Sequence, residues 1–230
     1  GMAQNDLVDL PIDLEKSPQR PLPSGALSLG EVRIFTFTTF IGGLLLIALI
    51  AIKAVYVALA LLLCIYLYNL MHKKWNLSLI FMGLCRGLVY CVAAVLVFVT
   101  NEQSILWTPL LYFAGLLAAY IIALTLVAQK EADGSLGYRK WLAFGIIVIP
   151  LLAHFTIMHQ FTPALIIMGI ILPLWLLRSA RFIWITPPKV VPAILGWLAG
   201  ICLVDAFFLA LLDRPELSGI AGACFVITVL

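Results

Sequence analysis

Residues 34–71 read IFTFTTFIGGLLLIALIAIKAVYVALALLLCIYLYNLM, and Lys53 is the single charged side chain among them. A helix needs about 20 mostly apolar residues to cross the hydrocarbon core of a bilayer. The stretch is therefore long enough for two membrane-spanning helices joined near Lys53. Its apolar residues are continuous and do not alternate with polar ones, so the pattern predicts helices and not the strands of a membrane barrel.

The remainder of the chain has the same character. Its 230 residues are 64% hydrophobic and 11% charged, whereas soluble domains are about 45–50% apolar and about 25% charged. We therefore predict an all-α, polytopic transmembrane helical bundle in the lipid bilayer. The predicted spans are residues 34–52, 54–71, 77–99, 105–128, 141–158, 161–177 and 190–212, and a shorter apolar run covers 217–230.

Basic residues are distributed unevenly over the predicted connections. Cytoplasmic loops of membrane proteins carry an excess of lysine and arginine. Here basic connections alternate with connections that hold only Lys53 or Arg214, so we predict that the basic loops face the cytoplasm from an inner or plasma membrane. The net charge of only +3 gives no indication of a nucleic-acid partner. The basic loop positions are Lys16, Arg20, Arg33, Lys73, Lys74, Lys130, Arg139, Lys140, Arg178, Arg181 and Lys189.

A polar motif precedes the first predicted span, where residues 5–28 read NDLVDLPIDLEKSPQRPLPSGALS. In a helix, Asn5, Asp9 and Asp13 share one face because they are four residues apart. Oxygen ligands of this kind suit Mg²⁺, which is often shared with substrate phosphates. Arg20 can bind phosphate oxygens through its planar guanidinium. The simpler interpretation of the same stretch is a solvated acidic loop.

The motif resembles the first aspartate-rich motif of the UbiA superfamily of intramembrane prenyltransferases, in which NDxxDxxxD is followed by RPLPSG. Two further segments also resemble parts of that family. Tyr68 and Lys73 are similar to a tyrosine–lysine signature at the end of the family's fourth helix. The segment MGLCRG, residues 82–87, resembles a fifth-helix segment of the EboC-like branch. The resemblance extends from Asn5 to about residue 212.

This resemblance implies a Mg²⁺-dependent enzyme that ionises a prenyl diphosphate to an allylic cation, which a hydrophobic acceptor of unknown identity then attacks. It implies that Asp9, Asp13 and Lys73 take part in catalysis. The implied metal ligands are Asn5, Asp6, Asp9, Asp13 and Asp133. The implied ligands of the diphosphate are Arg20, Lys73, Lys74, Arg86, Lys130 and Arg139.

The family has nine transmembrane helices, with the first motif at the cytoplasmic end of the second. The resemblance therefore implies that residues 1–230 form a single prenyltransferase-like domain that lacks roughly the first two helices. About seven to eight helices of the nine-helix fold would then be present, and the run 217–230 would exceed the expected number.

Two features depart from the family pattern. The second motif, typically DxxxD, aligns with QKEAD, so that Gln129 replaces an aspartate, Asp133 matches, and Glu131 lies at another helical angle. Pro11 predicts that the first helix kinks or ends before Asp13. These departures leave open a catalytically degenerate relative that binds lipid or acts as a scaffold. A cation-coupled transporter is less favoured, because transporter sites commonly lie near the bilayer midplane.

Two charged residues lie well inside predicted spans. Charged side chains at such positions normally face a partner or a cavity. Arg86 and Asp205 could therefore pair with each other, or Arg86 could reach toward the diphosphate or the acceptor. His72, next to the basic pair after the second span, could assist at the same site or be simply a polar helix end.

Overall fold

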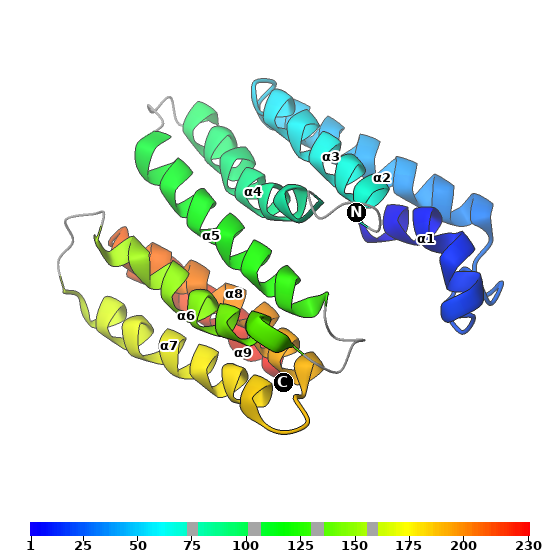
Figure 1. Ribbon diagram of the computed structural model, residues 1–230. Coiled ribbons are helices and arrows are strands. Elements are labelled where there is room, and N and C mark those ends of the chain that lie inside the picture. Colours follow the sequence, from blue (N-terminus) through cyan, green and yellow to red (C-terminus); the bar gives the residue numbers. More distant parts are fainter. Residues whose placement is uncertain (73–77, 101–106, 130–135, 156–160) are drawn as a thin grey trace. The chain divides into compact units, whose positions relative to one another are not determined.

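A computed structural model describes residues 1–72, 78–100, 107–129, 136–155 and 161–230. These residues form helices joined by turns, and no strand occurs among them. The prediction of an all-α protein is thus confirmed. The chain divides into two compact units, Gly1–Leu106 and Trp107–Leu230, which are described separately below (Figure 1).

The described residues of unit 1 form four helices, and the short first helix contacts both the second and the third (Figure 1). The third and fourth helices pack along each other. Ala51 and Ala54, at the junction of the second and third helices, pack against Val95 of the fourth. Small side chains at such junctions let membrane helices approach closely. The helices are α1 (Met2–Lys16), α2 (Leu29–Ile50), α3 (Ala54–Met71) and α4 (Ser78–Thr100).

Helix α1 continues through Pro11 as far as Lys16, so it does not end at the proline. A proline inside a helix removes one backbone hydrogen bond and crowds the preceding turn. The helix nevertheless persists because side chains on both sides of Pro11, those of Asp9 and Asp13, are buried against other parts of unit 1. Lys16 lies in the last turn, where a positive charge complements the helix dipole.

Helix α2 begins at a capping box. The Ser28 hydroxyl accepts a hydrogen bond from the Glu31 backbone N–H, and the Glu31 carboxylate accepts one from the Ser28 backbone N–H. These two bonds satisfy donors that a helix start leaves free. Beyond this cap the helix exposes large apolar side chains, of which Leu49 is 83% exposed. Such a surface is suited to hydrocarbon and not to water.

Unit 2 is organised around α8, which contacts α5, α7 and α9. Trp197 of α8 is completely buried, and its backbone carbonyl accepts a hydrogen bond of 2.7 Å from the Tyr120 hydroxyl of α5. The Trp197 indole donates to the carbonyl of Leu176 in α7 at 3.3 Å. The elements are α5 (Trp107–Ala128), η1 (Gly137–Trp141), α6 (Leu142–Leu151), η2 (Leu152–Phe155), α7 (Pro163–Trp184), α8 (Val190–Leu211) and α9 (Pro215–Val229).

Seven helical segments of the described chain are long and apolar enough to cross a membrane. They match the seven predicted spans, whereas α9, with 15 residues, is shorter. The largest difference is in α7, which continues seven residues beyond the predicted end at residue 177. The guanidinium of Arg178 stacks over the Trp175 ring at 4.7 Å and that of Arg181 over Phe182 at 4.9 Å. These contacts explain how two arginines continue an otherwise apolar helix.

We expect Gly196→Ala to destabilise unit 2 by about 1–3 kcal/mol, the usual cost of overpacking. A Cβ at position 196 would overlap the Ser179 side chain, with its Cβ 2.9 Å away, and would separate α7 from α8. Thermal unfolding in detergent measures the effect. Gly115→Ala in α5 is the matched control, because a Cβ there meets nothing within 4 Å. Equal stability of Gly196→Ala and wild type would contradict the close packing.

Candidate functional site

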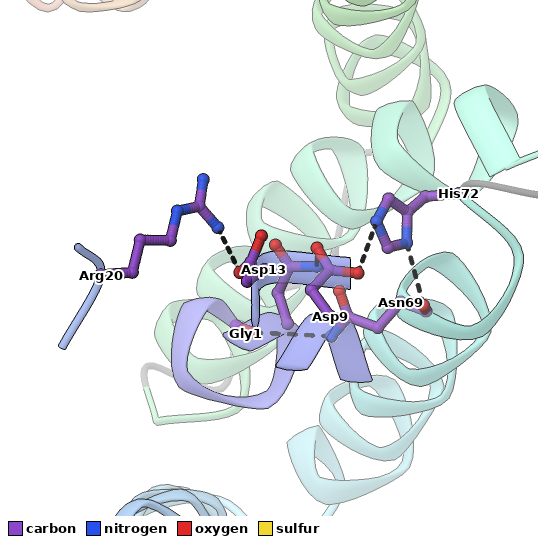
Figure 2. Close-up of polar contacts among 7 residues, drawn as sticks. Gly1, Asp9, Asp13, Arg20, Asn69 and His72 are labelled. Atoms are coloured by element: carbon purple, nitrogen blue, oxygen red, sulfur yellow. Dashed lines mark hydrogen bonds and ion pairs between the residues drawn. The ribbon is translucent and has the colours of Figure 1, made fainter. Parts of the chain in front are cut away.

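Two buried carboxylates on α1 form the centre of the candidate site. Asp9 and Asp13 are each 5% exposed and lie one helical turn apart. Arg20 donates to Asp13 Oδ2 at 2.7 Å, while the Asn5 amide donates to Asp9 Oδ2 at 3.0 Å. His72, at the end of α3, places its Nε2 3.3 Å from Asp9 Oδ1. Figure 2 shows Arg20 and His72 approaching the acidic face from opposite sides.

The loop after α1 carries Arg20 back toward the helix. The Arg20 backbone N–H donates to the Ser17 carbonyl at 3.1 Å, and the Ser24 N–H donates to the Arg20 carbonyl at 2.9 Å. Gly25 has a φ of +77°, which glycine adopts without steric cost, and the chain turns there toward α2. The Arg20 side chain remains 49% exposed, so that its guanidinium is accessible to a ligand.

A cavity of about 430 Å³ opens beside this ion pair. Its polar lining consists of Asp6, Asp13, Arg20 and Glu31. The other lining residues are mostly apolar: Ala3, Pro21, Leu22, Pro23, Leu27, Val32 and Phe35. On a helix with about 100° per residue, Asp6 and Asp13 differ by only about 20°, which explains why both face the same cavity. The cavity thus joins charged groups to an apolar surface.

Asn69 of α3 is a site residue that the sequence analysis missed. It is 2% exposed, and its amide donates to Gln4 Oε1 at 3.0 Å. The amide also donates to the Gly1 carbonyl at 3.5 Å (Figure 2). Asn69 thereby connects the end of α3 to the first turn of α1. The sequence did indicate that Asn69 has a partner, because it is an amide within an apolar span. Such groups in membrane helices usually hydrogen-bond to a neighbouring helix.

The donor set is compatible with Mg²⁺, although it does not form a complete cage. Within the parts of the chain that the structure describes, no three histidine, cysteine, aspartate or glutamate side chains converge as metal ligands would. Mg²⁺, however, is usually bound by one or two carboxylates together with waters and substrate phosphates. Asp9 and Asp13 supply carboxylate oxygens of the kind it prefers.

Several predicted site residues are not part of this arrangement. Lys73, Lys74, Lys130 and Asp133, together with Glu131, lie outside the described residues. Arg86 is exposed on α4 and does not line the cavity beside Asp13. Arg139, in unit 2, donates to the Leu126 carbonyl at 2.9 Å and to Gln129 Oε1 at 3.2 Å, so it stabilises the end of α5. The suggested pair of Arg86 and Asp205 would join the two units and stays a prediction.

The acidic helix α1 and the apolar spans both fall within the match to a known protein family. Residues 1–212 match the UbiA prenyltransferase family. The chain belongs to this family. The match begins before α1 and ends after α8, so that it covers the candidate site and seven apolar helices. It confirms the family predicted from the aspartate motif, whereas the EboC-like branch stays a prediction.

Three curated relatives are each named digeranylgeranylglyceryl phosphate synthase. The protein of Sulfurisphaera tokodaii is 30% identical over 115 residues, which are 50% of this chain and 36% of that relative. The protein of Methanococcus maripaludis is 48% identical over 46 residues, or 20% of this chain and 16% of the relative. The protein of Methanocaldococcus jannaschii is 37% identical over 76 residues, or 33% and 27%. The matches therefore span well under half of these relatives' lengths. No solved structure matches the chain significantly.

We expect Asn69→Leu to loosen α1, because the buried hydrogen bond to Gln4 is lost at a cost of about 0.5–1.5 kcal/mol. Hydrogen exchange of the α1 amides measures the change, and faster exchange throughout residues 2–16 is expected. The double variant Gln4→Leu/Asn69→Leu should lose less stability than the sum of the losses in the two single variants, because the two side chains are in direct contact. Gln19→Leu, at an exposed glutamine, is the control. Additive effects would contradict the contact.

Proposed function

We propose that this UbiA-family protein is an intramembrane prenyltransferase that moves an isoprenoid chain from a prenyl diphosphate to a hydrophobic acceptor. The observation that carries the proposal is the buried Asp13, which lines a largely apolar cavity and accepts a hydrogen bond from Arg20 at 2.7 Å, one turn from the buried Asp9. A ligand with a charged head and a hydrocarbon tail matches both parts of this site. The family match supports the same reaction class.

The reaction separates charge, and the residues of α1 and its loop are suited to that task. The bond between the first prenyl carbon and the diphosphate oxygen breaks, and its electron pair leaves with the diphosphate. Mg²⁺ would neutralise the developing negative charge on this leaving group. Asp9 and Asp13 would hold the metal, and the exposed guanidinium of Arg20 would bind diphosphate oxygens. The acceptor then forms a bond to the allylic carbon and gives up its proton, which the departing diphosphate can take, within an apolar surrounding that excludes water.

The remaining assignments rest on the family resemblance. Asn5, Asp6 and Asp133 would complete the metal site. Lys73 would bind the diphosphate and assist its departure. Further diphosphate ligands would be Lys74, Arg86, Lys130 and Arg139. The active-site loops would face the cytoplasm, because the basic connections carry them. Units 1 and 2 would belong to one catalytic domain, since the family match runs across both.

The names of the relatives supply a first acceptor class to test. They describe synthases of a glyceryl phosphate that carries prenyl chains. A lipid with a glyceryl phosphate group and at least one prenyl chain is therefore the acceptor that we would offer first. An aromatic ring with an apolar substituent is the second.

A catalytically degenerate, lipid-binding protein is the second candidate, and one contact favours it. Gln129 stands where the family pattern has an aspartate, and its side-chain oxygen accepts a hydrogen bond from Arg139. An amide is a weaker ligand for Mg²⁺ than a carboxylate. Under this alternative, prenyl diphosphate would bind without being consumed.

We expect Mg²⁺-dependent binding of a non-hydrolysable prenyl diphosphate analogue to the protein in nanodiscs. Asp9→Asn and Asp13→Asn should each strongly weaken the Mg²⁺-dependent part, because each removes a carboxylate charge from the metal site. Glu15→Gln is the matched control, since Glu15 is an exposed acid on the same helix. Binding is measured by displacement of a fluorescent analogue. A wild-type protein that binds the analogue equally well in EDTA would contradict the proposed metal site.

Release of diphosphate separates the two candidate functions. We expect wild-type protein supplied with prenyl diphosphate, Mg²⁺ and the glyceryl phosphate acceptor to release diphosphate and form a prenylated lipid, detected by mass spectrometry. Binding without release would favour the degenerate alternative. In that event, Gln129→Asp would test whether a restored carboxylate in the second motif restores turnover.

A further inference from the structure

The proposed function uses Asp9 as a metal ligand, but it does not explain why α3 contacts that carboxylate. Three contacts fix the imidazole of His72. Its ring stacks on Tyr68 at a centroid distance of 5.4 Å, and its Nδ1 lies 2.9 Å from the Asn69 backbone carbonyl. Its Nε2 lies 3.3 Å from Asp9 Oδ1. The ring therefore has little freedom to turn away from α1.

The hydrogen positions on the imidazole follow from these partners. A backbone carbonyl only accepts hydrogen bonds, so Nδ1 donates to Asn69. His72 thus approaches Asp9 through its second ring nitrogen, Nε2.

The Asp9 carboxylate is held by both of its oxygens. Asn5 donates a hydrogen bond to Oδ2 at 3.0 Å, whereas the approach of His72 Nε2 to the solvent-shielded Oδ1, at 3.3 Å, is an ion-pair contact and not a hydrogen bond. These two contacts restrict how the carboxylate can turn.

Asn69 links this contact to the position of the whole helix. Its backbone carbonyl orients His72 (Figure 2), while its side-chain amide binds Gln4 in the first turn of α1. One residue of α3 thus sets both the position of α1 and the direction of the imidazole. Asn69 and His72 are one turn apart, so that α3 presents both toward the same neighbour.

We propose that His72 is a positioning residue for Asp9, which holds the carboxylate in the orientation required for a divalent cation at the prenyl diphosphate site. The inference rests on the proposed metal role of Asp9 and adds the residue that orients this ligand. Side chains that contact and orient metal ligands typically contribute about tenfold to hundredfold in metal affinity. His72 thereby contributes to the site without contacting the metal or the substrate.

The test measures binding of Mn²⁺ alone to the protein in nanodiscs, by electron paramagnetic resonance of the free ion. His72→Phe keeps a ring that can stack on Tyr68 and removes both nitrogens. We expect it to raise the half-saturating Mn²⁺ concentration by about tenfold to hundredfold. His72→Gln keeps a donor toward Asp9, so its half-saturating Mn²⁺ concentration should lie close to that of the wild type. His154→Phe, the same change at a histidine of unit 2, should have no effect.

A double variant distinguishes positioning from a general effect on folding. If His72 acts through Asp9, His72→Phe should cause no further loss of Mn²⁺ affinity in the Asp9→Asn background. Unchanged hydrogen exchange of the α1 amides in His72→Gln would confirm that the helix remains docked. Should His72→Phe not fold, His72→Leu provides a second side chain without a donor.

Three results would overturn the inference: unaltered Mn²⁺ affinity in His72→Phe, additive losses in the double variant, or no Mn²⁺ binding by wild type. Failure of the proposed function gives a different pattern. In that case the wild-type protein would bind Mn²⁺, and His72→Phe would weaken this binding, but prenyl diphosphate would not bind in a Mg²⁺-dependent way. Each outcome therefore identifies which of the two proposals has failed.

Discussion

Buried carboxylates need partners, and this requirement shapes unit 1. Moving a charge out of water without compensation is costly enough that such groups are almost always paired or bound to metal. Asp9 and Asp13 meet the requirement with different partners, His72 from α3 and Arg20 from the following loop. These two contacts connect α1 to both elements that flank it in space. The helix, the loop and the end of α3 thus depend on one another.

The same requirement explains why α1 remains helical on both sides of Pro11. Pro11 lies between the two carboxylates, where an isolated helix would lose a backbone bond and be expected to break. Asp9 is anchored before the proline and Asp13 after it, so both halves are fixed independently of the missing bond. Local propensity is a weak guide when tertiary contacts on each side oppose it.

The sequence predicted most of the fold because membrane spans are determined by length and composition. All seven long helices could be located from continuous apolar runs, with errors of a few residues at their ends. Larger errors occurred where side chains compensate for local polarity. Arg178 and Arg181 interrupt the apolar pattern, but they stack on Trp175 and Phe182, and α7 continues to Trp184.

The candidate site was predictable mainly where its residues are close in sequence; His72 was named as a residue that could assist there, but its contact with Asp9 was not predicted. Asn5, Asp9, Asp13 and Arg20 belong to one motif, and the structure brings them together. Asn69 and His72 join them from more than 50 residues away, through contacts that depend on how α1 docks on α3. No local pattern contains that information. A polar residue at the end of an apolar span indicates that a partner exists, but not which one.

The candidate site lies on a short helix beside the spans, and this location matters for a substrate that has a charged head group and a hydrocarbon chain. A diphosphate carries several negative charges and is best stabilised where basic groups and water are accessible, whereas a prenyl chain is stabilised in hydrocarbon. If the metal ligands lay at the midplane of a span, the diphosphate would have to enter a low-dielectric region. With the ligands on α1 and Arg20 on an exposed loop, the head group would remain at the surface. If Asp9 binds the metal as proposed, its restricted orientation would help to hold the diphosphate at that surface.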